Sequence, residues 1–104
     1  MARFDVYSNP DKSEHQHTPF VLDVQNDHLS GVETRIVIPL RDAQAHGSRL
    51  ERVHPAFSIK GRDVVLDTPT MATFPRAWLH TPVASLAPQR ATVQDALDTL
   101  FGSY

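Results

Sequence analysis

Apolar and polar residues alternate in short runs along the first three-quarters of the chain. In the stretch ARFDVYS, Ala2, Phe4 and Val6 alternate with polar neighbours, and FVLDVQN repeats the pattern with Asp23 on its polar face. A period of two residues is typical of a half-buried β-strand. The stretches TRIVIPL and RAWLHT predict two more strands, and we expect Pro39 to close the first of them.

The remaining segments predict a hairpin and two loops. AFSIKGRDVVLDT reads as a β-hairpin with a turn near Lys60 and Gly61. SNPDKSEHQHTP is polar and contains two prolines, so it predicts a long exposed loop, and HGSRLERVHP predicts irregular structure. Because the short strands follow one another without intervening helices, the pattern favours a small antiparallel barrel over a doubly wound sheet.

The period changes near the end of the chain. Apolar residues then recur at helical spacing, at Val93, Ala96, Leu97, Leu100 and Phe101. Pro88 suits a first helical turn, and Gly102 suits the left-handed residue that ends a helix. The sequence therefore predicts a helix from about residue 88 to 101. The expected fold is mainly β, a barrel with one C-terminal α-helix.

Composition narrows the classes of function. With 104 residues, of which 40% are hydrophobic, we expect one domain that spans residues 1–104. A net charge of −2 argues against broad electrostatic binding to nucleic acid or to anionic membranes. The chain has no cysteine, no apolar run typical of a signal peptide and no stretch long enough to span a membrane. We therefore expect a cytoplasmic protein.

Candidate chemistry is sparse. His15 and His17 are close in sequence, but they lie in a predicted loop without a nearby third ligand, so we expect no metal site. Asp95 and Asp98 lie on the polar face of the predicted helix, where carboxylates are normally solvated. For Asp23 we expect an ion pair with a basic neighbour rather than catalysis. No glycine-rich phosphate loop is present. These observations predict a binding or structural module without a cofactor, not an enzyme.

Several of these stretches resemble one family. FVLDVQNDHL followed by ETRIVIPL, residues 20–40, is similar to the second and third strands of the CcdB-type toxins of bacterial toxin–antitoxin modules. RFDVYSN resembles their first strand, MATFP the segment before their last strand, and VQDALDTLF their C-terminal helix. The resemblance implies an SH3-like CcdB/MazF-type barrel with one C-terminal helix, assembled as a homodimer. It also implies a cytoplasmic plasmid-maintenance toxin that binds the DNA gyrase A subunit, traps the gyrase–DNA cleavage complex and is neutralised by a CcdA-like antitoxin.

The resemblance also assigns sites to individual residues. It places gyrase contact at the chain end, at Phe101, Gly102, Ser103 and Tyr104. It places antitoxin contact at Asn26, His28 and Asp98. The family pattern at the tip is Phe-Trp-Gly-Ile, so this chain lacks the tryptophan in either possible alignment. An anchoring aromatic at an interface commonly contributes about 2 kcal/mol or more, roughly thirtyfold in affinity.

Two alternatives remain open at the level of sequence. One is a MazF-like endoribonuclease on the same barrel, with RNA contacts from Arg35, Arg62 and Arg76, although the acidic balance disfavours it. The other is a non-toxic module that keeps only the antitoxin-binding surface. The altered tip is the best support for this second alternative.

Overall fold

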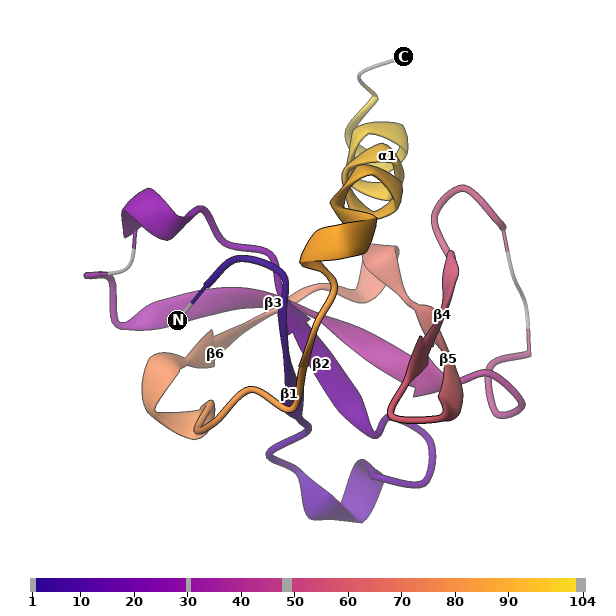
Figure 1. The fold of residues 1–104 in the computed structure, drawn as a ribbon, viewed down its shortest axis with the longest axis horizontal. Coiled ribbons are helices and arrows are strands. Elements are labelled where there is room, and N and C mark those ends of the chain that lie inside the picture. Colours follow the sequence, from indigo (N-terminus) through magenta and orange to yellow (C-terminus); the bar gives the residue numbers. More distant parts are fainter. Residues whose placement is uncertain (1, 30, 48–49, 103–104) are drawn as a thin grey trace.

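The computed structural model of the protein describes residues 2–29, 31–47 and 50–102. In these residues, seven strands form one sheet in the order β4-β5-β3-β2-β1-β7, and β6 pairs with β3 outside this path. All pairings are antiparallel, and the sheet curls into a nearly closed barrel with one C-terminal helix (Figure 1). The strands are β1 (Asp5–Ser8), β2 (Phe20–Asp23), β3 (Thr34–Asp42), β4 (Ala56–Ile59), β5 (Arg62–Leu66), β6 (Ala72–Pro75) and β7 (Ala84–Ser85).

The central strand, β3, is longer than its sequence predicts. It pairs with β2, β5 and β6 and continues for three residues beyond Pro39, so the prediction that Pro39 closes the strand is wrong. Proline lacks a backbone N–H but keeps its carbonyl. Here the carbonyl oxygen of Pro39 accepts a hydrogen bond from the backbone amide of Asp67 at 3.0 Å. The strand therefore loses one donor without losing its place in the sheet.

Both faces of β1 and β2 are covered. Val6 and Leu22 pair in the main core, whereas Tyr7 and Val21 belong to a second buried cluster with Val37, Leu79 and half-buried Phe74. The predicted polar face of these strands is thus buried, because barrel closure places other segments over it. β1 also begins later than predicted: Phe4 has a left-handed φ of 75° and precedes the strand.

The hairpin prediction is confirmed. β4 and β5 pair from Ala56↔Val65 to Ile59↔Arg62, and the two residues between the strands, Lys60 and Gly61, have φ values of 52° and 79°. Positive φ at both central residues is the geometry of the turn that matches the natural twist of a two-stranded ribbon. The local sequence signal was sufficient here because the turn itself fixes the register.

Single turns of 3₁₀ helix fill most of the remaining connections. They are η1 (Lys12–Glu14), η2 (Asp27–Leu29), η3 (Thr68–Thr70), η4 (Arg76–Trp78) and η5 (Ala87–Gln89). The predicted strand in RAWLHT is wrong, since its first half forms η4, and β6 and β7 flank it instead. The polar segment after β1 is a loop as predicted, and η1 is its exposed part.

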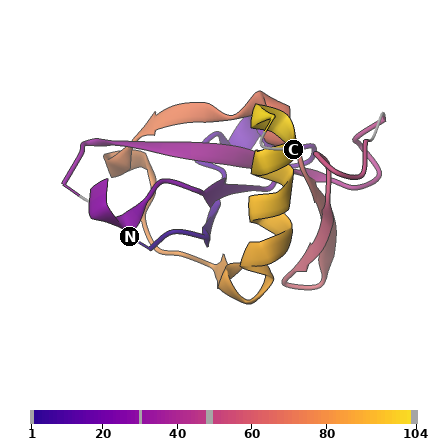
Figure 2. The same ribbon diagram turned by 90° about the horizontal axis from the view of Figure 1, so that it is seen from above.

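The helix α1 (Arg90–Phe101) closes one end of the core. η5 precedes it and contains Pro88, so the α-helix begins two residues later than predicted. Val93 and Leu97 pack in the main core cluster, which β4 and β5 also line through Ile59 and Val64. Figure 2 shows α1 running beside the β4–β5 hairpin. This packing holds the part of the helix up to Leu97 against the barrel.

Candidate partner-binding surfaces

The last turn of α1 carries an aromatic side chain that the barrel does not cover. Val93, Ala96 and Leu97 are buried, and Leu100 is half-buried. Phe101 comes next and is 68% exposed, which decides in favour of a surface position over a core position. The C-terminal end of α1 lies at the edge of the molecule in Figure 1. The apolar stripe of the helix therefore runs out of the core and ends in an accessible ring.

Gly102 ends the helix in the predicted left-handed conformation. Its φ is 77°, and its backbone N–H donates to the carbonyl oxygen of Asp98. A residue with a Cβ atom is strained at this φ, so position 102 serves as a helix cap. It contributes backbone and no side chain to the tip. The other two predicted tip residues, Ser103 and Tyr104, lie outside the described residues.

A polar network links the residues predicted to contact an antitoxin. Asn26 and His28 are exposed in the turn after β2, where the Asn26 side-chain oxygen accepts a hydrogen bond from the His28 amide at 2.9 Å. Asp98, in α1, accepts a hydrogen bond from the Gln94 side chain at 2.9 Å. These two places are far apart in the sequence, and one arginine connects them.

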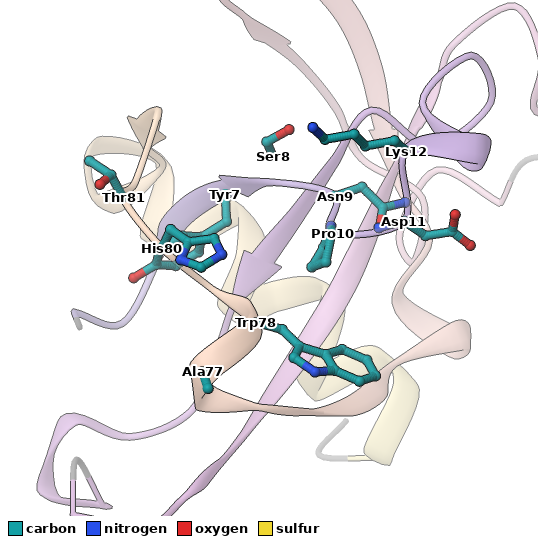
Figure 3. A pocket seen from close by; sticks show the side chains of 10 residues that line it. All are labelled: Tyr7, Ser8, Asn9, Pro10, Asp11, Lys12, Ala77, Trp78, His80 and Thr81. Carbon is teal, nitrogen blue, oxygen red and sulfur yellow. The ribbon is translucent and has the colours of Figure 1, made fainter.

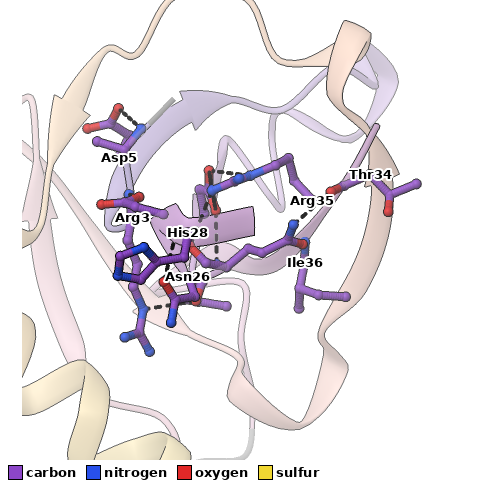
Figure 4. A network of polar contacts seen from close by, with 12 residues as sticks. Arg3, Asp5, Asn26, His28, Thr34, Arg35 and Ile36 are labelled. Atoms are coloured by element: carbon purple, nitrogen blue, oxygen red, sulfur yellow. Dashed lines mark hydrogen bonds and ion pairs between the residues drawn. The ribbon is translucent and has the colours of Figure 1, made fainter. Parts of the chain in front are cut away.

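Arg3 is that arginine, and the sequence did not indicate it. Its backbone amide donates to the Asp27 carboxylate at 2.6 Å, and its Nε donates to the carbonyl oxygen of Val24 at 3.0 Å (Figure 4). Its Nη2 donates to the side-chain oxygen of Gln94 at 3.3 Å. The turn after β2 and the polar face of α1 thus form one continuous surface, joined by the segment before β1.

A buried ion pair fixes the chain that leads into the turn after β2. Arg35 Nε and Nη2 donate to the two carboxylate oxygens of Asp23, both at 2.9 Å, and both side chains are fully buried. Burial raises the pKa of the Asp23 carboxyl, while hydrogen bonds from the Gln25 amide and from Arg35 counteract the rise. The predicted pairing of Asp23 with a basic residue is confirmed. Arg35 Nη2 also donates to the carbonyl oxygen of Gln25 at 3.2 Å, which fixes the chain just before Asn26.

A groove of about 640 Å³ lies on another part of the barrel, between the loop after β1 and the segment around η4. Trp78 borders it, with Pro10 and His80 also at its walls (Figure 3). The indole ring is 52% exposed and packs against Phe74 at 5.4 Å between ring centroids. Because Arg76–Trp78 form η4 rather than the predicted strand, Trp78 and His80 do not lie on one strand face.

The comparison with known families identifies the family to which this barrel belongs. The family model described as CcdB protein matches residues 3–102. The chain belongs to the CcdB family. A search of curated proteins found no match. The family match spans the first strand, the central strands and α1, and the antiparallel barrel with its C-terminal helix agrees with it.

CcdB-family membership makes the chain a toxin of the toxin–antitoxin class. The family poisons DNA gyrase and is not known for a catalytic activity. The endoribonuclease alternative also loses one of its proposed RNA contacts, because Arg35 is buried and paired with Asp23. Within the part of the chain that the structure describes, no helix has the length and apolar character needed to cross a bilayer.

Proposed function

We propose that this chain is a single CcdB-like toxin domain, residues 1–104, that acts as a homodimer in the cytoplasm and catalyses no reaction. Its target is the DNA gyrase A subunit, and it traps the gyrase–DNA cleavage complex. The observation that supports this most directly is the helix tip: Phe101, the last residue of α1, is 68% exposed, whereas Val93 and Leu97 earlier on the same apolar stripe are buried. Family membership supplies the rest of the argument.

The tip consists of Phe101, Gly102, Ser103 and Tyr104, with Phe101 as its aromatic anchor. In a two-fold dimer the same surface patch occurs on both subunits, so two tips can form one composite patch. An acidic protein suits a protein target better than direct contact with DNA. The aromatic ring supplies the type of side chain that dominates the energetics of such interfaces.

The test is plasmid cleavage by purified gyrase with ATP, in the presence of the wild-type protein and of two variants. Phe101→Ala removes the anchor, and Leu50→Ala is the matched control, because Leu50 is 70% exposed and lies outside the helix. We expect cleaved plasmid with wild type and with Leu50→Ala. For Phe101→Ala we expect the concentration needed for cleavage to rise roughly thirtyfold, as for loss of an anchor of about 2 kcal/mol. Equal cleavage by both variants would exclude the tip as the contact.

We further propose that a CcdA-like antitoxin binds the surface made by Asn26, His28 and Asp98. The support is the hydrogen-bond path through Arg3 and Gln94 that joins the two halves of this surface. The probe is the product of the open reading frame next to this one, measured by calorimetry. We expect Arg3→Ala to weaken binding by separating the two halves, whereas Leu50→Ala binds like wild type. Unchanged binding by Arg3→Ala contradicts this site.

One observation favours a second candidate, a non-toxic module that binds antitoxin only. Gly102 acts as a helix cap with φ of 77°, so the position that follows the phenylalanine carries no aromatic ring. This candidate predicts antitoxin binding without any gyrase-dependent plasmid cleavage, from protein shown to be folded. The same two assays therefore separate the candidates.

A further inference from the structure

Two imidazoles and a carboxylate meet where the loop between β3 and β4 runs beside the end of β5. His46 and His54 come from the loop, and Asp67 directly follows β5. One ligand atom from each residue lies within 4.8 Å of the others. The loop is fastened here by backbone hydrogen bonds, including Leu66 N–H to the carbonyl oxygen of Pro55 at 2.9 Å. Asp67 comes from a different segment than the two histidines, so the sequence spacing did not reveal the cluster.

The two imidazoles of this cluster differ in their hydrogen bonding. His54 Nδ1 accepts a hydrogen bond from the Leu50 amide at 2.9 Å, which leaves the proton on Nε2. That nitrogen lies 3.2 Å from Asp67 Oδ1. His46 Nε2 is buried and has no hydrogen-bond partner in the part of the chain that the structure describes. A buried polar atom without a hydrogen-bond partner is energetically unfavourable, so its presence requires an explanation.

Asp67 is prepared to act as an anionic ligand. Its Oδ2 accepts a hydrogen bond from Arg41 Nε at 2.8 Å, and the carboxylate is largely buried. Arg41 thus orients the carboxylate and leaves Oδ1 directed at the histidines, which is the usual role of an outer partner at a metal site.

We propose that His46 Nε2, His54 Nε2 and Asp67 Oδ1 bind a divalent transition-metal ion of the zinc class. Imidazole and carboxylate together suit zinc, cobalt and nickel, whereas magnesium and calcium prefer oxygen ligands alone. Ligand atoms around tetrahedral zinc are about 3.3 Å apart, and the candidate ligand atoms all lie within 4.8 Å of one another, so no pair has to close by more than about 1.5 Å. Three protein ligands leave a fourth position for solvent.

Metal binding at this site changes the loop. The ion replaces the proton on His54 Nε2, and that proton moves to Nδ1. Nδ1 can then no longer accept the hydrogen bond from the Leu50 amide. Arg52 lies between these two residues in sequence, and its Nη2 is 3.7 Å from the Asp95 carboxylate of α1. An ion at this site is therefore linked to the helix through a single loop.

The test uses tag-free protein titrated with Zn²⁺ by calorimetry and with Co²⁺ by visible absorption. His46→Ala removes the unpartnered ligand, and His17→Ala is the matched control, because it removes an exposed imidazole from the HQH stretch. We expect one site of equal affinity in wild type and His17→Ala, and at least tenfold weaker binding in His46→Ala. Equal affinity of wild type and folded His46→Ala would overturn the proposal.

A measurement on the wild-type protein keeps the proposal testable if His46→Ala does not fold. Paramagnetic Ni²⁺ broadens amide signals close to the bound ion. At substoichiometric Ni²⁺ we expect broadening centred on residues 46, 50–54 and 66–68, with a shift of the Leu50 amide on Zn²⁺ addition. Broadening centred on residues 15–17 would show that the exposed HQH stretch binds the ion and that the proposed site does not.

Discussion

Removing one member of the buried Asp23–Arg35 pair is the sharpest test of how this barrel is stabilised. Both side chains have 0% exposure, and the closest approach of Arg35 Nη2 to the carboxylate is 2.8 Å. Arg35→Met keeps a long side chain of similar volume but leaves the Asp23 carboxylate buried without its cation. Breaking a buried pair in this way costs about 3–5 kcal/mol of the free energy of unfolding. Domains of this size have roughly 5–15 kcal/mol in total.

Replacing both members gives the opposite expectation. Asp23→Leu/Arg35→Met removes both charges and leaves an apolar contact between β2 and β3. Buried pairs replaced by apolar residues of similar volume are often neutral or stabilising by about 1–4 kcal/mol, because neither charge has to be desolvated on folding. Arg35 Nη1 has no hydrogen-bond partner among the described residues, which adds to the cost of burying the wild-type guanidinium. We therefore expect the double variant to be close to wild type or more stable.

The assay is equilibrium unfolding in urea at one protein concentration, because dimerisation would make the midpoint concentration-dependent. With a denaturant slope of about 1.5 kcal/mol per M, Arg35→Met lowers the midpoint by roughly 2–3 M. The control is Arg62→Met, which removes a cation whose side chain is 39% exposed and paired with Asp42. Exposed pairs contribute about 0–1 kcal/mol, so its midpoint changes little. A loss below about 1 kcal/mol for Arg35→Met would refute the reasoning that this charge is fully desolvated.

Three further outcomes follow from the structure. Gly61→Ala should destabilise the domain by about 1–2 kcal/mol in urea unfolding, because its φ of 79° is strained for alanine although no atom obstructs the added Cβ. Leu97→Ala should cost about 2–5 kcal/mol, whereas Phe101→Ala should change the unfolding free energy by less than about 0.5 kcal/mol, since only Leu97 lies in the core. The Arg62 hydrogen bond lowers the pKa of Asp42 in the folded state, so its contribution to stability is present above about pH 4 and is lost as the pH falls through the folded pKa. The stability difference between wild type and Asp42→Asn should therefore shrink below pH 4 in unfolding measurements across pH.

The features that could be predicted from sequence are those set by local geometry. The β4–β5 hairpin follows from two turn residues with positive φ, and the end of α1 follows from Gly102. Alternation correctly divided β2 into two faces, but it could not show that both are buried, because the covering segments are distant in the chain. The same holds for β1, where Tyr7 alternates with Val6 and is nevertheless buried. The strand prediction for RAWLHT was wrong for a related reason. Its first three residues form a 3₁₀ turn, in which Trp78 contacts Phe74, a residue outside the segment.

The candidate sites also differ in how far the sequence could reveal their residues. The resemblance to a family assigned contact roles to Phe101 and Asp98, which both lie on α1, and these roles stay predictions. Arg3 was missed because its role depends on contacts to Val24, Asp27 and Gln94, which no spacing rule connects. The cluster at Asp67 likewise forms only when a loop folds back along β5. Polar sites assembled from distant segments require the fold before they can be recognised.

The residues of α1 that pack against the barrel are separate from the residues of its exposed tip, and this separation limits what family membership implies about the target. Val93, Ala96 and Leu97 hold the helix to the barrel, and their contacts are complete before the exposed tip begins. Substitutions at an exposed tip leave the unfolding free energy nearly unchanged, whereas each interface anchor is worth about 2 kcal/mol in binding. Phe101 can therefore be replaced at little cost to the fold, and a change of binding partner at this residue requires no change in the barrel. This is why the barrel and helix match the family while the residue after Phe101 is a capping glycine, and why gyrase cleavage rather than structure decides the target.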